Sequence, residues 1–119
     1  MDDVKMLRDI MKLILVGIGY DVDVSEDGVQ AIELYQKSID DGKPYDVVIM
    51  DLTIPGGLGG KEAIVDIIKL NPAVKGIVTS GYADDPVMAN YSDYGFHGVI
   101  PKPFNKDDMM KALLDVLKD

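Results

Sequence analysis

The sequence of 119 residues contains no cysteine, and this absence excludes a disulfide framework, a thiolate zinc site and a cysteine nucleophile. Basic residues are scarce as well, since 12 Lys and Arg stand against 21 Asp and Glu, for a net charge of −9. A chain this acidic repels phosphate backbones and anionic lipids. We therefore expect neither direct nucleic-acid binding nor a role at a membrane surface.

Long apolar runs are also missing. The most apolar stretch, Leu13 to Tyr20, is too short to span a bilayer, and the start Met1-Asp2-Asp3 lacks the basic residues of a signal peptide. Hydrophobic residues make up 47% and charged residues 28%, which is typical of a globular domain. We expect a soluble, cytoplasmic protein with one domain over residues 1–119.

Apolar periodicity predicts helices that alternate with short strands. The expected helices run from about Val4 to Gly17, from Val29 to Ser38, up to Asn71, onward from Pro86, and after Asn105. The expected strands lie at 20–24, 47–50, 76–79 and 98–100. On the last helix, the apolar residues expected to face the core are Met110, Leu113, Leu114 and Leu117. This alternation predicts a parallel sheet covered by helices on both faces.

Polar residues follow the expected strands, at the edge where open α/β sheets bind ligands. They are Asp51 after the strand at 47–50, Thr79 and Ser80 at the next strand end, Lys102 after the last strand, and Asp2 and Asp3 before the first helix. Carboxylates packed together repel, and a divalent cation relieves the repulsion. Oxygen ligands without His or Cys suit Mg²⁺. With a lysine and a hydroxyl nearby, the set predicts an aspartate nucleophile in metal-assisted phosphoryl transfer.

Each of these residues also has an ordinary structural interpretation. An aspartate after a strand is more often a turn residue than a nucleophile, and Asp2 and Asp3 suit the first turn of a helix. Ser80 before Gly81 is typical of a turn. The functional interpretation therefore depends on the coincidence of all these residues at one sheet edge.

The ordered motifs of the chain resemble the receiver domain of two-component response regulators. The matching segments are Asp2-Asp3 with Arg8, Glu26-Asp27-Gly28 with Ala31, Val48 through Pro55, Ser80-Gly81-Tyr82, Gly95 with Gly98, and Lys102-Pro103-Phe104. The resemblance covers essentially the whole chain from Asp2 onward. The Ser80-Gly81-Tyr82 and Pro55-Gly56-Gly57 variants are most similar to receivers attached to hybrid sensor histidine kinases.

The resemblance implies a phosphoacceptor site. Asp51 would accept a phosphoryl group from a histidine kinase or a phosphotransfer protein. Asp3 and Asp51 would bind Mg²⁺ directly, together with the backbone carbonyl of Thr53, and Asp2 would act largely through metal-bound water. The domain would catalyse its own phosphorylation and dephosphorylation, but it would not be an enzyme in the usual sense.

The resemblance also implies a switch. Ser80 would supply the hydroxyl that moves on phosphorylation, and Lys102 would pair with the phosphoryl group. These movements would change partner binding.

The implied fold is a flavodoxin-like, doubly wound parallel sheet in the strand order 2-1-3-4-5. The central first strand should precede Asp2, so we predict a receiver truncated at the end of that strand. Its loss would leave a gap of about 9.5 Å between neighbouring strands, which a packed core does not tolerate. We therefore expect a homodimer, a strand-exchanged oligomer or a repaired sheet.

Three other functions stay open. A haloacid-dehalogenase-like phosphatase would have a second Asp two residues after the nucleophile, where this chain has Thr53. A flavodoxin-like cofactor binder would have a phosphate loop rich in Ser, Thr and Gly, whereas the turns here are acidic. A pseudo-receiver would keep the fold without phosphorylation and act as an interaction scaffold.

Overall fold

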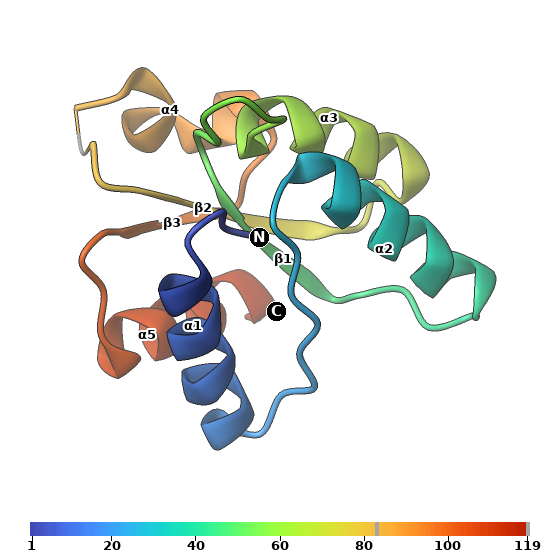
Figure 1. The fold of residues 1–119 in the computed structure, drawn as a ribbon, viewed down its shortest axis with the longest axis horizontal. Helices are drawn as coiled ribbons and strands as arrows, with labels where there is room; N and C mark the ends of the chain where they lie inside the picture. Colours follow the sequence, from blue (N-terminus) through green and yellow to red (C-terminus); the bar gives the residue numbers. More distant parts are fainter. Residues whose placement is uncertain (83, 119) are drawn as a thin grey trace.

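The computed structural model describes residues 1–82 and 84–118, and its core is a sheet of parallel strands. The sheet has the order β1-β2-β3, formed by β1 (Val47–Asp51), β2 (Lys75–Ser80) and β3 (Gly98–Pro101). The helices are α1 (Lys5–Ile18), α2 (Gly28–Asp40), α3 (Gly60–Leu70), the short α4 (Pro86–Ala89) and α5 (Lys106–Leu117), with a 3₁₀ helix, η1, at Tyr91–Tyr94. Figure 1 shows the sheet between two layers of helices.

Alternation along the strands divides the core between these two layers. Ile77 and Ile100 pack with α1 and α5 on one face of the sheet, whereas Met50 and Val78 pack with α2, α3 and α4 on the other. Successive side chains of a strand point to opposite faces, so apolar runs such as Val47 to Met50 serve both layers. The predicted parallel sheet with helices on both faces is confirmed for these three strands.

The predicted strand at residues 20–24 is wrong, because these residues form no ladder with a neighbouring strand. A single backbone hydrogen bond, from the Asp2 amide to the Ser25 carbonyl at 3.1 Å, ties the end of the segment to the sheet edge. A β-strand needs partners for its backbone groups along its length. The segment still runs beside β1 in Figure 1. Val22 and Val47 pack against the same apolar cluster, and the Tyr45 hydroxyl donates to Asp23.

The chain start occupies the position between that segment and β1. The Met1 amino group donates to the Ile49 carbonyl at 2.7 Å, and the Asp51 amide donates to the Met1 carbonyl at 2.9 Å. This alternation is the pattern of a parallel ladder. Segment 20–25, Met1–Asp2, β1, β2 and β3 therefore lie side by side in the predicted order, although only three of them form strands. The expected oligomer or repaired sheet stays a prediction.

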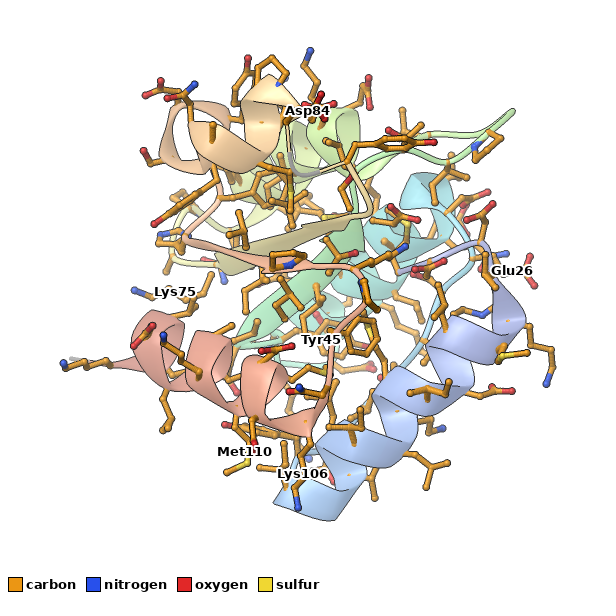
Figure 2. All side chains as sticks on the ribbon, turned by 90° about the vertical axis from the view of Figure 1, so that its left-hand side faces the viewer. Glu26, Tyr45, Lys75, Asp84, Lys106 and Met110 are labelled. Atoms are coloured by element: carbon orange, nitrogen blue, oxygen red, sulfur yellow. The ribbon has the colours of Figure 1, made fainter. Side chains whose placement is uncertain are left out.

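The predicted inner face of α5 is confirmed at Leu113 and wrong at Met110, Leu114 and Leu117. Met109, Leu113 and Val116 are buried, whereas Leu114 is 65% exposed. Figure 2 shows Met110 on the side of α5 that faces away from the sheet. Both sets have helical spacing, so the sequence pattern alone did not distinguish them. The difference arises from packing, because Met109, Leu113 and Val116 are the residues that contact the sheet cluster around Ile77 and Ile100.

Tyr35 links α2 to the loop before β1, and its removal should cost measurable stability. The fully buried Tyr35 hydroxyl donates to the Tyr45 carbonyl at 3.0 Å and accepts from the Asn71 side-chain amide at 2.9 Å. Tyr35→Phe leaves both partners without this oxygen, so we expect a loss of about 1–2 kcal/mol in the free energy of unfolding. Urea denaturation measures it, with Tyr82→Phe as control because Tyr82 is 70% exposed. Equal stability of the two variants would contradict this account.

Candidate functional site

Three carboxylates meet at the carboxyl end of β1. Asp2, Asp3 and Asp51 each place a carboxylate oxygen such that all three oxygens lie within 4.8 Å of one another. Asp2 is 1% exposed and Asp51 is 7% exposed, whereas Asp3 is open to solvent. The structure therefore brings together the three acidic residues that the sequence places at this edge.

Backbone contacts fix two of these carboxylates. Asp51 is the last residue of β1, and α3 begins directly behind it at Gly60, where a Cβ atom would come within 2.8 Å of the Asp51 carbonyl oxygen. The Arg8 guanidinium donates to the Asp2 carbonyl at 2.8 Å, and one Asp2 carboxylate oxygen accepts from the Val4 amide at 3.0 Å. These contacts hold the cluster in place before any ligand binds.

Lys102 is the cation of the site. Its ammonium donates to Asp2 at 2.9 Å and to Asp51 at 3.2 Å, and its side chain is 19% exposed. The Lys102 amide donates to the Ser80 carbonyl at 2.9 Å and so anchors the loop after β3 to β2. The Lys102–Pro103 peptide bond is cis. A single ammonium thus partly neutralises two buried carboxylates.

The site perturbs the ionisation of its members. Burial raises the pKa of Asp51, the positive charge of Lys102 opposes this shift, and Asp2 adds to it. Burial would lower the pKa of Lys102, but its hydrogen bonds and attraction to Asp2 and Asp51 outweigh burial and raise that pKa. Burial also lowers the pKa of the Met1 amino group to about 6. Burial is therefore the main cause of the shift at Asp51, and the neighbouring Asp2 carboxylate adds to it.

The raised pKa of Asp51 predicts a pH-dependent difference in stability. The folded protein holds the Asp51 proton more tightly than the unfolded chain does. The stability from this residue is therefore complete below the ordinary aspartate pKa of about 3.9 and is lost as pH rises through the folded-state pKa. We expect Asp51→Asn to gain stability relative to the wild type as the pH rises from about 4 through the raised folded-state pKa of Asp51, without divalent cations. Urea denaturation at several pH values measures this, and a difference that does not change with pH would contradict it.

Other residues expected at the site lie nearby, and of these Thr53 contacts the acidic cluster through its backbone. Ser80 is buried at the end of β2, and its hydroxyl accepts a hydrogen bond from the Tyr82 amide at 3.0 Å. Thr53 lies in the exposed loop after β1 and contributes a backbone hydrogen bond that lowers the pKa of Asp51. Thr79 lies one residue before the position that the motif spacing assigns to the switch hydroxyl. It pairs with Asp51 in the register between β1 and β2.

The donor set fits Mg²⁺. Asp2, Asp3 and Asp51 offer only carboxylate oxygens, their atoms are close enough to share one ion, and Lys102 already provides positive charge for the same oxygens. Mg²⁺ binds to a few carboxylates and keeps several waters. The exposure of Asp3 leaves the cluster open on one side for those waters.

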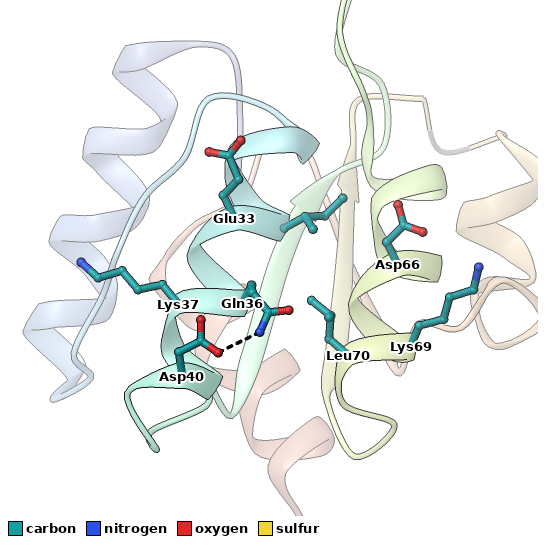
Figure 3. A pocket seen from close by; sticks show the side chains of 8 residues that line it. Glu33, Gln36, Lys37, Asp40, Asp66, Lys69 and Leu70 are labelled. Carbon is teal, nitrogen blue, oxygen red and sulfur yellow. Dashed lines mark hydrogen bonds between the residues drawn. The ribbon is translucent and has the colours of Figure 1, made fainter.

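Two hollows lie outside the acidic cluster. One, of about 200 Å³, borders Thr53 and reaches Lys61 on α3 and Asp85 before α4. The other is an open groove of about 610 Å³ between α2 and α3, with a mixture of acidic and basic side chains around Ile32 and Leu70 (Figure 3). The groove shares no residue with the acidic cluster, so it takes no part in the chemistry of that site.

Across the described residues, no helix has the length and apolar character to cross a membrane.

Comparisons with known proteins agree with this geometry. The family model described as the response regulator receiver domain matches residues 1–114. The chain is 33% identical over 118 residues to the chemotaxis protein CheY of Thermotoga maritima, covering 98% of this chain and 93% of that protein. It is 29% identical over 100 residues to the sensor kinase CckA of Brucella abortus, covering 84% of this chain but only 10% of the kinase.

Solved structures share the fold at lower sequence identity. The CheY of a CheX–CheY–BeF₃–Mg²⁺ complex from Borrelia burgdorferi has a TM-score of 0.88 at 19% identity, covering 99% of this chain and 86% of that one. The receiver domain of the sensor histidine kinase PA1611 of Pseudomonas aeruginosa, with a magnesium ion in its active-site cleft, has a TM-score of 0.83 at 22% identity, covering 99% and 93%. At these identities the likeness establishes the fold alone.

Proposed function

Because the chain belongs to the response regulator receiver family, we propose that it accepts a phosphoryl group on Asp51 in a Mg²⁺-dependent reaction and thereby changes how it binds a partner. Receiver domains are the receiving components of two-component signalling, and that coarse role follows from family membership. The observation that carries the finer proposal is the meeting of Asp2, Asp3 and Asp51 within 4.8 Å, with Lys102 bonded to two of them.

The chemistry of the site supports this proposal. A carboxylate oxygen of Asp51 attacks the phosphorus of a phosphohistidine, the P–N bond breaks, and the histidine nitrogen keeps the electron pair and takes up a proton. Bound Mg²⁺ would neutralise the charge that develops on the phosphoryl oxygens. Asp2 and Asp3 would hold that ion beside Asp51, and Lys102 would turn from Asp2 to a phosphoryl oxygen. Burial raises the pKa of Asp51 because it disfavours the charged carboxylate. The same burial favours the loss of that carboxylate's own charge when its oxygen bonds to phosphorus.

The consequences of phosphorylation are part of the same proposal. The phosphoryl group carries about −1.5 to −2 units of charge, in place of the single charge of the Asp51 carboxylate, and brings new acceptor oxygens next to Ser80. The Ser80 hydroxyl, which accepts from the Tyr82 amide here, would donate to one of these oxygens. Its movement would shift the loop between β2 and α4, and partner binding would respond.

The partners and context follow from the relatives. A histidine kinase or phosphotransfer protein would donate the phosphoryl group, and the match to the sensor kinase CckA supports the hybrid-kinase subtype. The CheX–CheY complex shows that a receiver of this fold binds a partner protein in that system. We extend both to this chain as proposals, along with a cytoplasmic location and self-catalysed phosphorylation and dephosphorylation.

The second candidate is a pseudo-receiver that serves only as an interaction scaffold. The three-stranded sheet favours it, because the segment at 20–25 is held to the sheet edge near Asp2 by one backbone hydrogen bond. If segment 20–25 moved away, Asp2 would lose this hydrogen bond, and the site would bind Mg²⁺ poorly.

One experiment distinguishes the two candidates. The protein is incubated with acetyl phosphate, and its intact mass is measured with Mg²⁺ and with EDTA. The phosphoacceptor proposal predicts a gain of one phosphoryl group with Mg²⁺ and none with EDTA, the adduct being labile to base. No gain under either condition would favour the scaffold.

A further inference from the structure

Among the residues that the structure describes, one buried side-chain oxygen has no hydrogen-bond partner. Among the described residues, Thr79 Oγ1 is the buried side-chain oxygen or nitrogen without a hydrogen bond, and Thr79 is 0% exposed. Buried hydroxyls almost always bond to a neighbour, and leaving one unpaired costs stability. Ser38, a buried hydroxyl elsewhere in the chain, follows the usual pattern and donates to the Tyr35 carbonyl at 2.6 Å. The Thr79 hydroxyl is therefore an exception that calls for a physical reason.

The register of the sheet places this hydroxyl beside the phosphoacceptor. Thr79 pairs with Asp51 on β1 and with Ile100 on β3. Ile77, two residues earlier on β2, packs in the layer with α1 and α5, whereas Val78 packs in the opposite layer. Because side chains alternate along a strand, Thr79 faces the same layer as Ile77. In a parallel sheet, paired residues on neighbouring strands point to the same face, so Thr79 and Asp51 are side by side.

Lys102 passes over this position. It follows β3, its ammonium reaches Asp51 at the end of β1, and β2 lies between these two strands. The Lys102 side chain must therefore cross the end of β2, where the residues available are Thr79 and Gly81. Gly81 has no side chain, and Ser80 Oγ already accepts from the Tyr82 amide, so Thr79 Oγ1 is the unpaired side-chain acceptor at this end of β2.

The ammonium of Lys102 will need such an acceptor. It carries three protons, and the structure gives it two bonds, to Asp2 and to Asp51. Those carboxylates belong to the cluster that fits a divalent cation. A bound cation and the ammonium carry the same sign of charge and compete for the same oxygens. When the cation binds, the ammonium loses one of its acceptors while it stays largely buried.

We propose that the Thr79 hydroxyl accepts a hydrogen bond from the Lys102 ammonium when a divalent cation displaces it from Asp2, which makes Thr79 a positioning residue for Lys102. The Thr79 hydroxyl, which has no hydrogen-bond partner here, would thus supply the acceptor that Lys102 loses when a cation binds. The Thr79 hydroxyl keeps the Lys102 ammonium over the end of β2. From this position the ammonium can reach a phosphoryl group on Asp51. This inference deepens the proposed function and rests on its cation site.

The test measures Mg²⁺ binding and cation-free stability in matched variants. Thr79→Val removes the hydroxyl and keeps the branched shape, and Thr79→Ser keeps the hydroxyl. Calorimetric titration with MgCl₂ at fixed ionic strength should show a dissociation constant about tenfold higher for Thr79→Val, the effect of one lost hydrogen bond to a charged group, and within about twofold of wild type for Thr79→Ser. With EDTA, the melting temperature of Thr79→Val should equal or exceed that of the wild type, because a buried unpaired hydroxyl is lost.

A double-mutant cycle shows whether Thr79 acts through Lys102. In the Lys102→Met background, Thr79→Val should change the Mg²⁺ dissociation constant by less than about twofold, because no ammonium is left to accommodate. An equally large effect in that background would overturn the proposal, as would an unchanged affinity of Thr79→Val in the wild-type background. A lower melting temperature of Thr79→Val in EDTA would also overturn it, because the hydroxyl would then already be bonded. A wild type that binds no Mg²⁺ would instead refute the cation site itself, together with this inference.

Discussion

Asp51→Asn is expected to abolish phosphoryl uptake from acetyl phosphate in the presence of Mg²⁺. The amide lacks the negative charge and the nucleophilic oxygen of the carboxylate, and it is a poorer ligand for a hard cation. Asn is close to Asp in size, so it fits the same position at the end of β1, where the side chain is nearly buried. The intact mass, measured over a time course, should show one added phosphoryl group on the wild type and none on the variant.

Asp46→Asn is the matched control for this loss. Asp46 precedes β1 at the opposite end of the same strand and is exposed, so its replacement changes the net charge by the same amount without entering the acidic cluster. It should be phosphorylated as fast as the wild type. Uptake by Asp51→Asn at the wild-type rate would mean that another residue accepts the phosphoryl group, and the proposed role of Asp51 would be wrong.

Lys102→Met should cause the largest loss of stability at the site in the absence of divalent cations. Methionine matches the length of lysine but removes the charge that Asp2 and Asp51 share at 2.9 and 3.2 Å. Two nearly buried carboxylates would then repel each other without a counter-ion. Removing one partner of a buried ion pair costs several kcal/mol, and with Lys102 partly exposed we expect a loss of about 3 kcal/mol in the free energy of unfolding.

Mg²⁺ should restore much of that stability, because it supplies positive charge to the same oxygens. Urea denaturation in EDTA and in MgCl₂ measures both effects. Lys106→Met is the control, since Lys106 lies on the exposed first turn of α5 (Figure 2). A Lys102→Met protein as stable in EDTA as Lys106→Met would show that the ion pairs contribute nothing measurable, and the electrostatic account of the site would be wrong.

Local sequence signals predicted the strands and helices that have strong, self-contained patterns. The run Val47 to Met50 is apolar on both faces and formed β1, and Asp85 with Pro86 marked the start of α4. The strand predicted at 20–24 is wrong, because a strand forms only where a neighbouring strand pairs with its backbone, and the residues of the segment alone do not show whether one does. The predicted inner face of α5 was wrong at Met110, Leu114 and Leu117, since two apolar stripes run along that helix and only packing against the sheet distinguishes them.

The closeness of the acidic residues and Lys102 was predicted from the sequence, whereas their chemical roles stay predictions. Asp2 with Asp3, Asp51 and Lys102 come from three separate places in the sequence, yet the rule that ligands bind beyond the carboxyl ends of parallel strands brings them together. The unpaired hydroxyl of Thr79 was not foreseen. Its significance depends on the register between β1 and β2 and on the path of the Lys102 side chain. Both are properties of the folded structure that local sequence patterns do not reveal.

Identification of the modified residue shows directly whether the carboxylate cluster makes Asp51 the phosphoacceptor. The protein is treated with acetyl phosphate and Mg²⁺, the acyl phosphate is reduced with borohydride to leave a homoserine in place of the aspartate, and the digested peptides are sequenced by tandem mass spectrometry. The account predicts homoserine at position 51 and at no other aspartate. Homoserine at another position, or none at all in a folded protein, would contradict it.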